Sequence, residues 1–101
     1  MLALYVDYNR REFLPNGSQA IEIVLGSIGL MNPSVLEQKF EVGSRVILYD
    51  EGDRCLGVLR SGEWIDGWVA EIIPETVEEI TADEFEELRA VTKRAALHAV
   101  D

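Results

Sequence analysis

Three strand-like segments lie between residues 45 and 73, and their close spacing constrains the fold more than any other feature of the chain. The segments are RVILYD (45–50), RCLGVLR (54–60) and WIDGWVAEII (64–73), and three residues separate each from the next. Runs of aliphatic, β-branched and aromatic residues between Gly-, Ser- and Asp-containing clusters are typical of strands. The spacing therefore predicts a meander that ends at Pro74 and closes into a small barrel or a strongly bent sheet.

Residues 1–34 predict further β structure followed by a loop. The first segment, LALYVDY (2–8), is rich in aliphatic and aromatic residues and indicates a strand. LPNGS (14–18) has the residues of a type I turn, and AIEIVL (20–25) after it places its isoleucines on one face, which we expect to be buried. We expect a hairpin between this segment and either the N-terminal strand or the residues near Phe13.

Local irregularity is expected at several places. Gly57 lies in mid-strand, where a glycine indicates a bend or bulge at which a side chain would collide with a neighbour. Asp66-Gly67 predicts a second bulge or a tight turn, and GSIGLMNPS (26–34) predicts a loop. VLEQKF (35–40) fits either one helical turn or a strand leading into the next element.

A helix is predicted over about residues 82–99. Thr81 and Glu84 have the spacing of a capping box, and Ile80 can pack on Phe85 as a hydrophobic staple. Acidic residues cluster at the start of this segment and basic residues near its end, which suits the helix dipole. The inward stripe is expected to consist of Phe85, Leu88, Val91, Thr92 and Ala95.

These elements predict a mainly β (α+β) fold: a bent meander or barrel with an N-terminal β-hairpin and a C-terminal α-helix. The length of 101 residues suits a single domain over residues 1–101. Within it we expect an N-terminal β segment and loop (1–34), a barrel core (40–80) and the capped helix (81–100). No internal repeat or linker divides the chain.

Composition indicates a globular cytoplasmic protein. The hydrophobic fraction of 48% argues against disorder, and no apolar run approaches the roughly 20 residues of a membrane span. The N-terminus lacks the basic region of a signal peptide and indicates a first strand instead. The single cysteine, Cys55, cannot form an internal disulfide, so a reducing compartment is the simplest interpretation.

The formal net charge is −10, and most of it lies in the second half of the chain, where residues 75–87 hold seven acids and no base. A phosphate backbone attracts clustered Lys and Arg, so nucleic acid is not expected as a partner. Such a field would attract a basic protein or a cationic small molecule, or would simply keep the protein soluble. No membrane partner is expected either.

The stretch over residues 40–80 resembles an SH3-like small barrel of the tudor and KOW kind. The resemblance rests on Val42-Gly43 before the first strand, Gly57-Val58 in the second, and residues 67–69 (GWV) in the third. The N-terminal β segment and the C-terminal helix fall outside it. In its compact size the chain also resembles bacterial gene-cassette proteins, although no motif carries this second resemblance.

The SH3-like resemblance implies a module that binds a protein or peptide on an aromatic groove. In tudor-type members an aromatic cage holds a methylated Lys or Arg through cation–π attraction. The candidates for such a site here are Tyr49, Trp64 and Trp68, together with Asp66. The residues alone leave open whether the two tryptophans belong to the core, to an interface or to a ligand site.

Catalytic and metal sites are not expected. His98 stands near the end of the predicted helix, where it suits the helix dipole, and Cys55 lies inside a strand, where a buried thiol is typical. The acids of residues 50–53 lack the spacing of a calcium loop, and no lysine follows the glycines of residues 26–29. We therefore expect no enzyme activity and no cofactor.

Two functional hypotheses follow. The first is a non-catalytic module whose aromatic strand surface binds a peptide, a cationic ligand or a second copy of the chain as a homodimer. The second is an acidic regulator or immunity-like protein that binds a basic partner through residues 75–87. The acidic face of this second hypothesis comprises Glu75, Glu78, Glu79, Asp83, Glu86 and Glu87.

Overall fold

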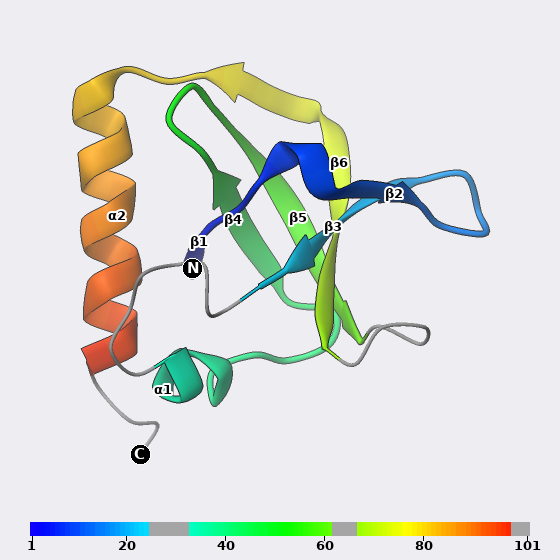
Figure 1. The fold of residues 1–101 in the computed structure, drawn as a ribbon, viewed down its shortest axis with the longest axis horizontal. Helices are drawn as coiled ribbons and strands as arrows, with labels where there is room; N and C mark the ends of the chain where they lie inside the picture. Colours follow the sequence, from blue (N-terminus) through cyan, green and yellow to red (C-terminus); the bar gives the residue numbers. More distant parts are fainter. Residues whose placement is uncertain (25–32, 62–66, 98–101) are drawn as a thin grey trace.

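The computed structural model describes residues 1–24, 33–61 and 67–97, whose path is shown in Figure 1. The predicted mainly β fold with a C-terminal helix is confirmed. In chain order the elements are β1 (Ala3–Tyr5), the 3-10 helix η1 (Tyr8–Arg10), β2 (Arg11–Phe13), β3 (Gln19–Ile23), α1 (Pro33–Glu37), β4 (Arg45–Tyr49), β5 (Asp53–Ser61), β6 (Trp68–Glu79) and α2 (Ala82–Leu97).

The strands form one mixed sheet in the order β1-β4-β5-β6-β3-β2. β4, β5 and β6 are antiparallel neighbours, so the predicted meander is confirmed. β1 pairs with β4 in parallel, with Ala3 opposite Ile47. The sheet has β1 at one edge and β2 at the other. Of the two predicted alternatives, these strands therefore form the bent sheet and not the closed barrel.

The predicted N-terminal hairpin forms between β2 and β3, with Phe13 opposite Gln19. Its turn has the expected chemistry, since the Gly17 N–H donates to the Leu14 carbonyl at 2.9 Å. Gly17 has φ of 86°, a left-handed conformation that glycine adopts without steric cost. β3 also pairs with β6, which attaches the hairpin to the meander.

β6 is longer than expected. The predicted end of this strand at Pro74 is wrong, because the strand continues to Glu79. The pairing between β5 and β6 shifts its register in this region, and a proline without an N–H is tolerated at such irregularities. At this irregularity the Thr76 side chain takes the place of a backbone acceptor. Its Oγ1 accepts from the Leu56 N–H at 2.8 Å and donates to the Ile73 carbonyl at 2.6 Å.

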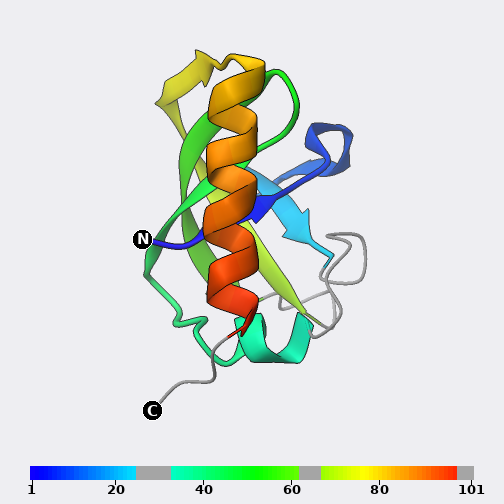
Figure 2. The ribbon, with the colours of Figure 1, turned by 90° about the vertical axis from the view of Figure 1, so that its left-hand side faces the viewer.

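Two clusters of buried side chains hold the fold together. Leu4, Val46 and Leu48 belong to the larger one, with residues of β3, β5, β6 and α1. Their neighbours Ala3 and Tyr49 belong to the smaller one, which includes residues of α2. Because successive side chains of a strand point to opposite faces, β1 and β4 contribute to both clusters, with α2 covering one face of these strands (Figure 2). Near its C-terminal end α2 also reaches the larger cluster through Ala96.

α2 has the predicted capping box. The Glu84 N–H donates to Thr81 Oγ1 at 3.2 Å, and the Thr81 N–H donates to Glu84 Oε1 at 3.4 Å. The predicted inward stripe is confirmed, since its five residues are all buried or partly buried. None of the described helices is long and apolar enough to cross a membrane.

α1 resolves the ambiguity of residues 35–40 in favour of a helical turn, and it takes in the last two residues of the loop expected over 26–34. The other residues of that loop, 26–32, lie outside the described part of the chain, as do residues 62–66 and the end of the predicted C-terminal helix, 98–101.

Candidate functional site

Tyr49, one of the candidate ligand contacts, is buried between β4 and α2. Its side chain is 1% exposed, and its ring makes edge contacts with Tyr5 and Phe85. Its Oη lies 2.8 Å from Thr92 Oγ1. A ligand would have to displace α2 to reach this ring, so the position of Tyr49 does not support a role in ligand contact.

Trp68 connects the sheet to α1. Its ring meets Phe40 in a T-shaped contact with 5.3 Å between centroids, and its Nε1–H donates to Glu37 Oε1 at 3.3 Å. Trp68 packs on the larger cluster and Tyr49 belongs to the smaller one, so the two rings do not share an aromatic surface. Trp64 and Asp66 lie outside the described residues.

The six predicted acidic residues are all exposed, and we call them the acidic ridge. They occupy the end of β6 and the start of α2, which lie across the top of Figure 1. Glu78 pairs with Arg54, and Glu86 lies 4.0 Å from Arg89. Within the described part of the chain, no ion pair involves the other four, which are Glu75, Glu79, Asp83 and Glu87.

The turn between β4 and β5 lies next to the acidic ridge and carries further acids. The Ile80 N–H donates to the Gly52 carbonyl at 2.9 Å, which attaches this turn to the segment between β6 and α2. Asp50 Oδ1 accepts from the N–H groups of Gly52 and Asp53, both at 2.8 Å. These hydrogen bonds hold the turn and orient the Asp50 carboxylate.

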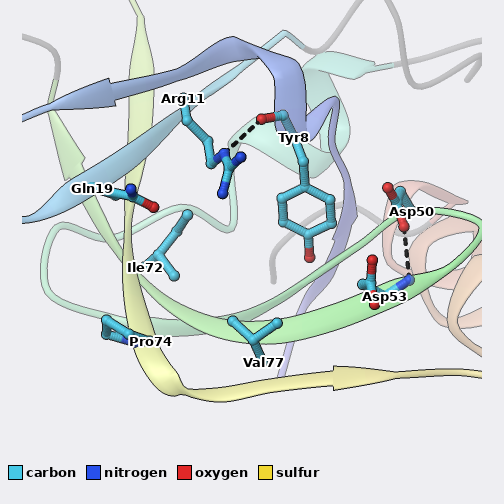
Figure 3. A pocket seen from close by; sticks show the side chains of 8 residues that line it. All are labelled: Tyr8, Arg11, Gln19, Asp50, Asp53, Ile72, Pro74 and Val77. Carbon is cyan, nitrogen blue, oxygen red and sulfur yellow. Dashed lines mark hydrogen bonds between the residues drawn. The ribbon is translucent and has the colours of Figure 1, made fainter.

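A cleft of about 230 Å³ opens between this turn, η1 and the β2–β3 hairpin (Figure 3). Arg11 and Gln19 lie at one end, and Asp50 and Asp53 at the other, with Tyr8 between them. The remaining lining residues come from β6 and are apolar: Ile72, Pro74 and Val77. No short motif predicts this cleft, because its parts come from segments up to about 70 residues apart in the sequence.

Tyr8 forms the inner wall of the cleft. Its hydroxyl donates to the Leu48 carbonyl at 2.9 Å and lies 3.6 Å from Cys55 Sγ. Burial raises the pKa of Tyr8 far above its ordinary value, with a further contribution from Cys55. Burial likewise raises the pKa of the Cys55 thiol, which is therefore protonated at neutral pH. The predicted buried thiol is confirmed, and its exposed fraction is 2%.

Arg11 is positioned by a backbone carbonyl of η1. Its Nε–H donates to the Tyr8 carbonyl at 2.9 Å, which holds the guanidinium at one end of the cleft. No carboxylate of the described residues lies within ion-pair distance of this guanidinium. Nor do three His, Cys, Asp or Glu side chains of those residues form a group that could hold a metal ion.

The fold and these surfaces define a mainly β domain with one C-terminal helix, an acidic ridge and a small cleft of mixed charge. Comparisons with protein-family models, with curated proteins and with solved structures found no match.

Proposed function

We propose that the protein is a non-catalytic binding module that takes up a basic protein or peptide on the acidic ridge. One observation carries the proposal: all six ridge side chains are exposed, and four of them have no ion-pair partner within the described residues. Unpaired carboxylates of like charge on adjacent segments repel one another, and Lys or Arg residues of a partner would relieve that repulsion.

An apolar side chain lies among these acids and extends the surface. Val77 stands between Glu75 and Glu78 in β6 and is 54% exposed. A basic peptide with an apolar residue could contact Val77 while its cations face the carboxylates, and exclusion of water around them would strengthen the attraction.

The other functional hypothesis, an aromatic strand surface, has less support from the described residues because Tyr49 and Trp68 are engaged in packing. The antiparallel meander of β4, β5 and β6 supports the proposed SH3-like resemblance of residues 40–80, a class rich in binding modules. We also propose a cytoplasmic location, which the reduced, buried Cys55 supports.

Fluorescently labelled poly-L-lysine is a suitable probe, because it tests charge without assuming a partner sequence. The double variant Glu75→Gln/Glu79→Gln removes two unpaired ridge charges and should weaken binding about tenfold at low salt. The control Glu12→Gln/Glu41→Gln changes the net charge equally but at exposed positions outside the ridge. Binding should also weaken steeply as NaCl rises from about 50 to about 300 mM.

Equal loss of affinity in the two double variants would mean that only the overall charge attracts the probe, and the ridge proposal would be abandoned. Binding that does not depend on salt would have the same consequence, since exposed charges are screened by added salt.

Pairing with a second copy through β2 is a further candidate. β2 lies at an edge of the sheet, its three residues are exposed, and Phe13 is 74% exposed. An exposed edge strand with an apolar residue favours pairing with another strand. Analytical ultracentrifugation over a dilution series should show a dimer that Phe13→Ser weakens. The control Val42→Ser, at another exposed apolar side chain, should leave the dimer unchanged.

A further inference from the structure

We infer that the cleft in Figure 3 binds one dipolar ligand: a lysine or arginine that carries a free α-carboxylate, either as the free amino acid or as the last residue of a polypeptide. The carboxylate is bound by Arg11, and the side-chain cation by Asp50 and Asp53. This binding site uses none of the six acids of the acidic ridge and shares only Val77 with the surface proposed for a basic partner, so the tests of the two proposals use different variants.

The opposed charges of the cleft carry the inference. Arg11 lies at one end and the two aspartates at the other, and they do not meet in an ion pair. A guanidinium that already donates its Nε–H to the Tyr8 carbonyl still has its terminal N–H donors for a carboxylate. A ligand with both charges would satisfy both ends at once.

Two other hollows of the described surface differ in this respect. The hollow of about 430 Å³ between the β2–β3 turn, β5 and β6 contains Arg60, which lies 3.7 Å from Glu71. The hollow of about 460 Å³ on the other side of β5 contains Arg54, which pairs with Glu78. In both, the arginine is neutralised by an acid of the same hollow, whereas Arg11 is not.

The middle of the cleft suits an aliphatic stem. Ile72, Pro74 and Val77 of β6 line it on one side, and the Tyr8 ring lines it on another. The methylene groups of a lysine or arginine side chain pack on such apolar surface while the charged end remains at a polar site.

The size and charge of the cleft also select against other ligands. Its volume of about 230 Å³ is below the range of pockets for drug-sized molecules, which begins at about 300 Å³, and suits a single amino acid. Two carboxylates at one end disfavour a phosphate or nucleotide through like-charge repulsion. The guanidinium at the other end disfavours a simple cation in the same way.

Both ends of the cleft are positioned before a ligand arrives. Asp50 is held by two N–H groups of its own turn, and Arg11 by the Tyr8 carbonyl. In contrast, no hydrogen bond from the described residues reaches the carboxylate of Asp53, which is therefore available to a cation. Fixed groups lose less conformational entropy on binding, which favours affinity for a small ligand.

The inference can be tested by titrating the protein with Nα-acetyl-L-lysine and following the backbone amides of β2 and the β4–β5 turn by two-dimensional NMR. This probe has one carboxylate and one ammonium. Nα-acetyl-lysine methylamide lacks the carboxylate, and Nα,Nε-diacetyl-lysine lacks the ammonium. Loss of either charge should weaken binding about tenfold or more, because each removes a charge-assisted contact.

Variants assign each charge to its end of the cleft. Arg11→Gln should bind Nα-acetyl-lysine and its methylamide equally, whereas the control Arg10→Gln, at an arginine beside Glu22, should behave as the wild type. Asp53→Asn should reduce the preference for Nα-acetyl-lysine over Nα,Nε-diacetyl-lysine, because only the Asp50 carboxylate is left to bind the ammonium. The comparison of ligands within the unmodified protein remains informative even where a variant does not fold.

A peptide ending in lysine and free L-lysine distinguish the two sources. Tighter binding of the peptide than of its C-terminal amide supports a polypeptide terminus, and equal binding of free lysine and the peptide supports the amino acid. No saturable shift with any of these ligands, or equal binding of the methylamide by the wild type, would overturn the inference.

Discussion

Gly57 of β5 lies against the side chains of its neighbouring strands. A Cβ added there would stand 2.7 Å from Leu48 Cδ1, 3.2 Å from Leu48 Cγ and 3.3 Å from Ala70 Cβ. Leu48 and Ala70 are fully buried, so neither can move aside freely. A side chain at this position would therefore collide with its neighbours, as expected from the sequence. The expected bulge lies between Arg54 and Leu56 and not at Gly57, which pairs regularly with both neighbouring strands.

The variant Gly57→Ala should lower the free energy of unfolding by about 1–3 kcal/mol, which is typical of overpacking in a core. Urea-induced unfolding would measure this change. Gly52→Ala is the matched control, because its nearest neighbour is Asp50 Oδ1 at 3.9 Å and the new methyl group has room. Equal stabilities of the two variants would contradict the packing explanation.

The three tyrosines all have raised pKa values. The hydrogen bond from Tyr5 to Glu51 Oε1, at 2.6 Å, raises the pKa of Tyr5 to about 12. Burial raises the pKa of Tyr8 and of Tyr49. In an unfolded chain the pKa of tyrosine is about 10. The folded protein should therefore show no tyrosine ionisation near pH 10.

This difference makes stability depend on pH at the alkaline end. Above about pH 10 the unfolded chain loses tyrosine protons that the folded protein retains, so the free energy of unfolding falls as the pH rises from about 10 towards 12. Below about pH 10 this contribution is fully present. Ultraviolet titration should show delayed tyrosine ionisation, and Glu51→Ala should bring one tyrosine back towards its ordinary pKa. A tyrosine that ionises near pH 10 in the folded wild type would contradict the assignment.

At the scale of elements, one buried hydroxyl adds hydrogen bonds to the apolar packing between α2 and the sheet. Thr92 is 1% exposed, and its Oγ1 donates to the Ala3 carbonyl of β1 at 2.5 Å. Because this proton is directed at Ala3, the Tyr49 hydroxyl donates to Thr92 at 2.8 Å. The same side chain therefore connects α2 to both β1 and β4.

Thr92→Val keeps the shape of the side chain but leaves the Tyr49 hydroxyl and the Ala3 carbonyl without this partner. It should lower the free energy of unfolding by about 2 kcal/mol or more, the cost of unsatisfied buried polar groups. Thr92→Ser keeps the hydroxyl and removes one methyl group, which should cost about 1 kcal/mol. Thermal unfolding would compare them, and a valine variant as stable as the wild type would show that the hydroxyl is unimportant.

The strand β6 shows where local patterns mislead. Pro74 indicates the end of a strand when the sequence is considered alone, because proline cannot donate to the ladder. The strand nevertheless continues, since Thr76 supplies a hydroxyl to Leu56 across the irregular stretch. That partner is 20 residues away in the chain, so the local sequence around Pro74 does not reveal it.

At the scale of the whole molecule, the net charge of −10 should make stability sensitive to salt. The compact state brings like charges closer together than the unfolded chain does, and salt screens their repulsion. Raising NaCl from about 20 to about 300 mM should increase the melting temperature by roughly 3–6 °C, which corresponds to about 1 kcal/mol for a domain of this size.

Calorimetry on Glu75→Gln/Glu79→Gln provides the comparison for this salt effect. The double variant has less repulsion to screen, so it should melt at a higher temperature in low salt and respond less to added NaCl. A melting temperature that falls on adding salt would show instead that the ion pairs of the surface outweigh its repulsion.

Some properties of the candidate sites could be predicted from the sequence and others could not, as was true of the fold. Exposure of the acidic ridge could be anticipated, because consecutive charged residues in a β strand end and a helix start have little chance of burial. Burial of Tyr49 could not, because it depends on which face of β4 receives α2. The cleft could not either, because Arg11 and Asp53 approach one another only after β2, β4 and β5 have joined the same sheet.

Features that depend on residues close together in the chain could be predicted from the local pattern of residues. These are the turn at Gly17, the meander of β4 to β6 and the capping box at Thr81, since their hydrogen bonds or pairings join near neighbours. Three other features became apparent only in the folded protein: the parallel pairing of Ala3 with Ile47, the side of β4 that α2 covers, and the opposed charges of the cleft. Contacts of this kind join residues that are far apart in the chain, so forming them closes long loops. Which of these contacts form depends on how the whole chain buries its apolar surface, and no local pattern of residues encodes that.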